Sequence, residues 1–157
     1  MQKNSFLLVL IALFITAMSA CKKEYKEPVY TPEKNKWIIN TDTFGPSNFI
    51  YYDTANVLYG AVNGKCAVYI RFWAKPVYEG DYLFRNIANE PYEISITIID
   101  SIRNYTYYSA ETDSIALKDQ QYAKVSVKNG KVSVSFNDKW LQRLNHVDQA
   151  KVSMNIE

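Results

Sequence analysis

Apolar and polar residues alternate on both sides of Asn129-Gly130, and this pattern predicts a β-hairpin over residues 122–136. Both residues of a two-residue turn need positive φ, which asparagine and glycine adopt more readily than other residues. Such a turn would pair Val125 with Val134 and place all the valines of the hairpin on one face, with the serines and lysines on the other. The turn and the hydrophobic pattern therefore agree on one register.

A second hairpin is expected over residues 57–73, around Asn63-Gly64. With a two-residue turn, Ala61 would pair with Cys66. The face that carries this pair is the more apolar of the two, so we expect it to face the core. Cys66 is then a small buried thiol, which is the usual environment of a free cysteine.

Shorter apolar segments between turn residues predict six further strands. They are expected near residues 36–40, 48–52, 81–84, 93–100, 105–109 and 150–156. One short helix is expected near the C-terminus, where Asp138 could cap four apolar residues at helical spacing: Trp140, Leu141, Leu144 and Val147. The predicted fold is therefore a single all-β domain over residues 36–157, an antiparallel β-sandwich or an open barrel built from hairpins.

The N-terminus has the layout of an export signal. Lys3 supplies a positive charge, and residues 6–17 are apolar except for Thr16. A membrane-spanning helix needs roughly 20 apolar residues, and this uncharged run is shorter, which favours a cleaved leader over a permanent span. We therefore expect residues 1–20 to be a signal peptide.

The residues that end this leader, Met18-Ser19-Ala20-Cys21, resemble a lipobox, the site that lipoprotein signal peptidase recognises. Met18 stands where the pattern prefers leucine. The resemblance implies that Cys21 is lipidated: its thiol takes a diacylglyceryl group as a thioether, and its new amine takes an acyl chain such as palmitate. Two or three such chains hold a protein on a membrane essentially permanently. The alternative is an ordinary signal peptide cut near Ala20, which would leave Cys21 as a free thiol.

Residues 21–35 are expected to form the lipidated cysteine and an extended tether, because they contain two prolines and no apolar periodicity. Lys22 follows the cysteine, in place of the aspartate that tends to retain enterobacterial lipoproteins in the inner membrane. The predicted location is therefore the outer membrane, with the domain facing either the periplasm or the cell surface.

Three short patterns resemble those of small β-rich lipoproteins of Bacteroidota. They are the charged tether at residues 22–27, Trp37 at the start of the domain, and the hairpin at 129–136 followed by a closing strand at 151–156. The resemblance implies a fold and a location in the cell envelope, and it carries no activity.

Charge and catalytic residue types exclude several functions. Eighteen basic and sixteen acidic residues give a net charge of +2, and the basic residues are scattered, which argues against nucleic acid as a partner. The chain has one histidine, His146, and after Cys21 only one cysteine, so we expect no catalytic triad, no metal site and no cofactor. Two acidic pairs, Glu79 with Asp81 and Glu90 with Glu93, are read as solvated turn residues.

The 13 tyrosines leave one functional clue. Tyr69, Arg71 and Trp73 alternate along one strand on the face expected to point outward, and such side chains suit a sugar ring or a partner protein. The alternative is that they cover a second core or merely satisfy strand propensity. We expect a non-enzymatic module that binds a glycan or an envelope protein. A small glycan hydrolase with a carboxylate pair and a purely structural envelope component are the competing functions.

Overall fold

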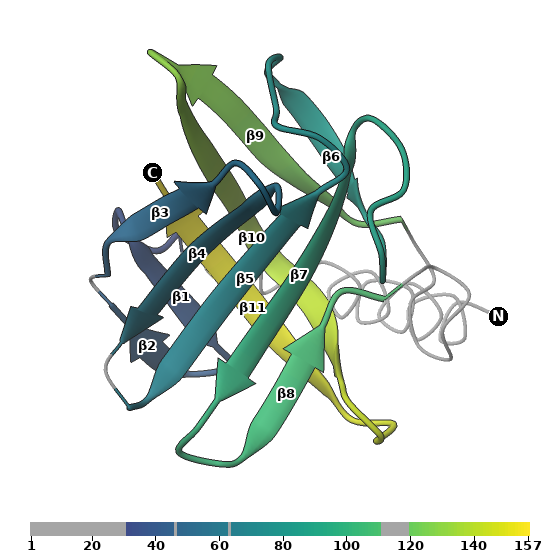
Figure 1. Ribbon diagram of the computed structural model, residues 1–157. Coiled ribbons are helices and arrows are strands. Elements are labelled where there is room, and N and C mark those ends of the chain that lie inside the picture. The colour runs from purple at the N-terminus through teal and green to yellow at the C-terminus, as the bar shows by residue number, and fades with distance from the viewer. Residues whose placement is uncertain (1–30, 46, 63, 111–119) are drawn as a thin grey trace, which may run out of the picture.

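The computed structural model describes residues 31–45, 47–62, 64–110 and 120–157 (Figure 1). The predicted signal peptide and Cys21 lie outside these ranges. The strands are β1 (Lys36–Ile39), β2 (Asp42–Phe44), β3 (Phe49–Tyr52), β4 (Val57–Val62), β5 (Cys66–Phe72), β6 (Gly80–Phe84), β7 (Glu93–Asp100), β8 (Tyr105–Tyr108), β9 (Tyr122–Lys128), β10 (Lys131–Arg143) and β11 (Gln149–Ile156). No helix in the described ranges is long and apolar enough to cross a membrane.

The eleven strands of the described ranges belong to one sheet, in which ten follow the order β2-β1-β11-β10-β9-β6-β7-β5-β4-β3 and β8 lies off this path. β6 joins β9 to β7, and β8 pairs with both β7 and β10, so the sheet closes on itself like a barrel. The β6–β7 pair is parallel and the other pairs are antiparallel. Figure 1 shows β3, β4, β5 and β7 lying across the layer formed by β1, β11 and β10. The all-β prediction is confirmed, and the six further strands lie where they were expected; the short strand β2 was not predicted.

The core lies between the two layers and is built from the inward-facing residues of each strand. Along β5, Cys66 and Val68 are buried and alternate with more exposed neighbours. The fully buried Trp37 indole stacks on Phe44, with ring centroids 6.0 Å apart, and its Nε1 donates a hydrogen bond to Cys66 Sγ at 3.4 Å. Burial raises the pKa of the Cys66 thiol to about 11, so this cysteine is the buried thiol that the sequence predicted.

The hairpin around Asn129-Gly130 has the predicted register, with Val125 opposite Val134. Both turn residues have positive φ, 52° and 75° respectively. The valines nearest the centre of the sheet are buried, and the lysines at the tip are exposed. Local turn chemistry therefore determined this hairpin, as predicted from the sequence.

Replacing Gly130 with valine is expected to lower the free energy of unfolding by about 1–3 kcal/mol, because a β-branched residue resists positive φ. A Cβ at this position would meet no atom within 4 Å, so the loss would come from backbone strain alone. Ser133→Val, at a half-buried strand position, is the control and should have little effect. Equal thermal melts for the two variants would contradict the turn assignment.

The register predicted for the other hairpin is wrong by one residue. Cys66 pairs with Val62 rather than with Ala61, and the Lys65 N–H donates to the Val62 carbonyl at 3.0 Å. The inward face of β5 is as predicted, whereas the inward face of β4 is the opposite one and carries Gly60. The cause is a longer loop, which an Asn-Gly pair also permits.

Gly60 shows why the face of β4 was hard to predict. A Cβ at this position would lie 2.4 Å from Cε1 of Phe49, so the Phe49 ring occupies the space that a side chain would need. That ring packs edge-on against Trp37, with centroids 5.8 Å apart. A core position without a side chain gives no hydrophobic signal in the sequence.

The predicted C-terminal helix is also wrong, because β10 continues through that segment to Arg143. A bulge between Phe136 and Lys139 shifts the register, and Asp138 within it has a φ of 51°. The bulge brings Leu141 onto the same inward face as Phe136. The extra residue in this strand therefore produced a spacing of apolar residues that resembles that of a helix. Of the four apolar residues on which the helix prediction rested, three are exposed: Trp140, Leu144 and Val147.

Candidate functional site

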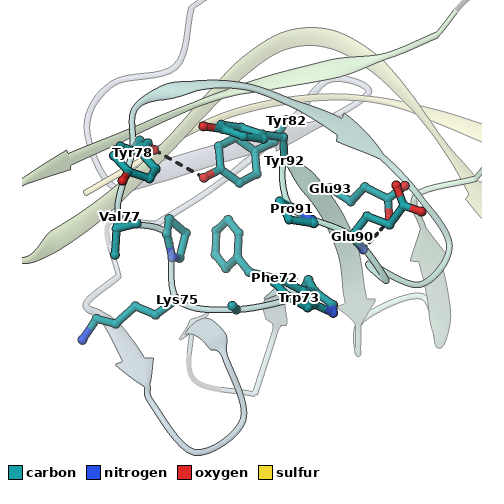
Figure 2. Close-up of a pocket in the computed structure, with 12 residues that line it drawn as sticks. Phe72, Trp73, Lys75, Val77, Tyr78, Tyr82, Glu90, Pro91, Tyr92 and Glu93 are labelled. Atoms are coloured by element: carbon teal, nitrogen blue, oxygen red, sulfur yellow. Dashed lines mark hydrogen bonds between the residues drawn. The ribbon is translucent and has the colours of Figure 1, made fainter.

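A pocket of about 190 Å³ lies where β5 ends and β7 begins (Figure 2). Two connections form its walls: residues 73–79, between β5 and β6, and residues 85–92, between β6 and β7. It is lined by Phe72, Trp73, Ala74, Lys75, Pro76, Val77, Tyr78, Tyr82, Glu90, Pro91, Tyr92 and Glu93. Five of these twelve side chains are aromatic, and we call this site the aromatic pocket.

The aromatic rings divide into a buried floor and an exposed rim. Phe72 and Tyr82 are buried and meet edge to face, with ring centroids 5.9 Å apart. Trp73, Tyr78 and Tyr92 are 53%, 66% and 48% exposed. The rim therefore offers three large ring surfaces to a ligand, above a floor that the core holds in place.

The wall at residues 73–79 is attached to the loop between β3 and β4. The Asn56 Nδ2 donates to the Trp73 carbonyl at 3.2 Å, and the Phe72 N–H donates to the Asn56 carbonyl at 2.9 Å. Lys75 pairs with Asp53 at 2.6 Å. These contacts fix the backbone of Trp73 and leave its indole free to contact a ligand.

The carboxylate of Glu93 fixes the opposite wall. Arg85 Nε donates to Glu93 Oε1 at 2.8 Å, and the N–H groups of Asn89 and Glu90 donate to Oε2 at 2.9 and 3.0 Å. Burial alone would raise the pKa of Glu93, but these hydrogen bonds outweigh it and the pKa is lowered. Glu93 is thus an ionised anchor of the connection rather than the solvated turn residue expected from the sequence.

Tyr92 completes this wall in a strained conformation. Its φ is 62°, which is uncommon for a bulky residue and costs about 1–3 kcal/mol. Its ring lies 5.3 Å from the ring of Tyr82, whose hydroxyl donates to the Tyr78 carbonyl at 3.3 Å. Burial, together with Tyr92, raises the pKa of Tyr82. The three tyrosines therefore support one another at this side of the pocket.

The three residues predicted to bind a ligand all lie on the outward side of the strand, so they cover no second core. Trp73, just beyond the end of β5, lines the aromatic pocket. Tyr69 and Arg71 instead line a neighbouring hollow on the outer face of β5 and β7. The structure thus brings Tyr69 and Arg71 together and places Trp73 in an adjacent site. Sequence reasoning missed Tyr78, Tyr82 and Tyr92, because they follow no periodic pattern and meet only through the β6–β7 pairing.

The other candidate residues do not form a second site. Glu79 and Asp81 are exposed on either side of Gly80. His146 lies in an exposed turn, where its N–H donates to the Arg143 carbonyl at 3.2 Å. Within the described ranges, no group of three or more histidine, cysteine, aspartate and glutamate side chains could hold a metal ion.

Comparisons with known proteins found no matching family model, no similar curated protein and no similar solved structure. The function is therefore inferred from the geometry of the pocket and of the neighbouring hollow.

Proposed function

We propose that this protein is a non-catalytic glycan-binding module whose binding site is the aromatic pocket, and that lipid on Cys21 anchors it to the outer membrane. The observation that carries the binding proposal is the exposed aromatic rim of Trp73, Tyr78 and Tyr92. Aromatic faces stack on the apolar faces of sugar rings. Exposed rings held by a fixed backbone lose little entropy when a ligand binds.

The polar groups of the pocket suit a sugar. Figure 2 shows Lys75 at one end of the pocket and Glu90 and Glu93 at the other. The exposed carboxylate of Glu90 can accept hydrogen bonds from sugar hydroxyls while the rings contact the apolar face, whereas Lys75 pairs with Asp53 and both oxygens of Glu93 are already bonded. Binding pockets of about 300 Å³ or more enclose a drug-sized ligand, so a pocket of about 190 Å³ suits a single sugar unit of a longer chain.

The same geometry argues against the hydrolase alternative. Glycosidases need a pair of carboxyl groups, one of which is an acid with a raised pKa. In this pocket the carboxyl groups belong to Glu90 and Glu93, and both oxygens of Glu93 already accept hydrogen bonds that lower its pKa. The pocket therefore supports binding better than hydrolysis.

Trp73→Ala tests the proposal. Loss of one stacking ring is expected to weaken binding by about 1–3 kcal/mol, or roughly 5- to 150-fold, on an array of defined neutral and acidic oligosaccharides. Because Trp73 is half exposed, the melting temperature should hardly change.

Trp140→Ala is the matched control. Trp140 is 42% exposed and lies on β10, opposite Lys151 of β11 and away from the pocket. Its replacement should leave glycan binding unchanged. The proposal is wrong if the wild-type protein binds no oligosaccharide of the array, or if the two variants lose affinity equally. A large fall in the melting temperature of Trp73→Ala would show that the indole belongs to the core.

A further inference from the structure

The hollow that Tyr69 and Arg71 line, beside the aromatic pocket, has polar walls. The register of the sheet brings its lining residues together. Val57, Arg71 and Ser95 form one row across β4, β5 and β7, and Tyr69 and Thr97 form the next row. Partners in a row point to the same side of a sheet. Asn86, in the connection between β6 and β7, completes a hollow of about 290 Å³.

The Asn86 connection is held over the sheet by a direct contact. The hydroxyl of Ser95 donates to the Asn86 carbonyl at 2.8 Å. Ser95 is buried and Thr97 is half-buried, whereas Arg71 is exposed. The hollow therefore has a fixed polar floor and one accessible cationic side chain.

Arg71 differs from the other three arginines, all of which lie in the described ranges. Arg85 pairs with Glu93, Arg103 with Asp100 and Asp42, and Arg143 with Asp148. Arg71 makes no ion pair in the part of the chain that the structure describes, and the hollow has no acidic residue in its lining. Its planar guanidinium is thus free to bind an oxyanion with two parallel hydrogen bonds.

The hollow lies next to the aromatic pocket along two paired strands. Arg71 of β5 pairs with Ser95 of β7. Trp73 lies two residues after Arg71, and Glu93 lies two residues before Ser95 on the antiparallel strand. Both Trp73 and Glu93 line the aromatic pocket. Residues two apart on a strand are separated by about 7 Å. A short glycan stacked on Trp73 can therefore reach the guanidinium of Arg71.

An aromatic surface also flanks the hollow on its other side. The ring of Tyr69 lies 4.9 Å from that of Tyr59, which in turn lies 6.4 Å from that of Tyr52. Tyr69 is 38% exposed. Arg71 consequently lies between the indole of Trp73 and a row of tyrosine rings, so a sugar bound on either side would bring its substituents near the cation.

We infer that this hollow is the anion subsite of the glycan site, and that Arg71 binds the carboxylate of an acidic sugar next to the unit held in the aromatic pocket. The inference rests on the proposed function and narrows it to uronic-acid-bearing glycans. Thr97 and Asn86 also line the hollow, so their hydroxyl and amide would bond to hydroxyls of the same sugar. A sulfate ester on a sugar shares the oxyanion chemistry, and the experiment separates the two.

The test is an array of oligosaccharides in matched pairs, each uronic acid chain beside its carboxyl-reduced counterpart, with sulfated forms of the reduced chains as a third set. The wild-type protein should bind at least one acidic chain about tenfold or more tightly than its reduced form. Arg71→Gln should remove that preference while keeping the affinity for the reduced chain. Arg71→Lys should restore part of the preference, since it retains the charge without the planar fork.

Lys128→Gln is the control, because it removes one positive charge at the exposed tip of the β9–β10 hairpin. It should leave the preference intact. Equal losses in Arg71→Gln and Lys128→Gln would show general charge attraction and overturn the inference, as would a preference that survives Arg71→Gln. Tighter binding to sulfated than to carboxylated chains would overturn the carboxylate assignment.

If the reduced chains bind and no acidic chain is preferred, this inference fails while the proposed function stands. If no chain binds at all, the proposed function itself fails.

Discussion

Replacing Cys21 with serine is expected to abolish the incorporation of labelled palmitate into this protein in a bacterial host. The transferase reaction requires a thiol that becomes a thioether, and a hydroxyl does not replace it. The same replacement should release the protein from the membrane fraction, because the acyl chains supply the binding energy, about 0.8 kcal/mol for each buried methylene. Metabolic labelling followed by fractionation measures both effects.

The other cysteine provides the control for this experiment. Cys66 is buried beside Trp37, so Cys66→Ser should leave palmitate labelling intact. Equal labelling of the wild type and Cys21→Ser, or no labelling of the wild type, would show that the lipobox interpretation is wrong. The alternative of an ordinary signal peptide, which leaves Cys21 as a free thiol, would then be favoured.

Trp37→Ala is expected to lower the free energy of unfolding by about 3–5 kcal/mol, the usual range for removing a buried aromatic side chain. Trp37 is fully buried, contacts Phe44 and Phe49, and pairs across the sheet with Met154. Its removal would leave a cavity that the closed sheet cannot fill by collapse.

Equilibrium unfolding in urea measures this loss, with Trp140→Ala as the comparison. Trp140 is exposed, and its backbone hydrogen bonds with Gln121 survive truncation of the side chain. We expect a loss within about 0.5 kcal/mol for Trp140→Ala, the range usual for surface positions. Similar midpoints for the two variants would mean that the indole of Trp37 contributes nothing to the core.

The sequence predicted most of the strands because alternation and turn chemistry act locally. Asn129-Gly130 determines its own register, and the flanking valines agree with it. The errors occur where one extra residue changes the alternation. Because the loop after Val62 is one residue longer than predicted, the inward face of β4 is opposite to the predicted one. The bulge near Asp138 gave a strand the apolar spacing of a helix.

The binding site could be predicted only in part, for a related reason. Tyr69, Arg71 and Trp73 share one strand direction, so alternation alone placed them on the outward side. Tyr78 and Tyr92 join Trp73 through the parallel pairing of β6 and β7, which is a long-range contact without a local signal. Within the described ranges, no acidic side chain lines the hollow around Arg71, and this too is a property of the folded sheet rather than of the sequence around Arg71.

The pairing of β1 with β11 has a consequence for the order of folding. In the part of the chain that the structure describes, β1 pairs with the short β2 and with β11, and with no other strand. Contacts between distant parts of a chain form slowly, because the intervening loop must close first. Trp37 and Ile39 thus lack their β11 partners, Met154 and Val152, until that strand has been synthesised. If the chain is exported as we propose, β1 would lack this partner until β11 has been synthesised, and the N-terminal strands would stay incompletely packed, and so easier to pass through a translocation channel, until then.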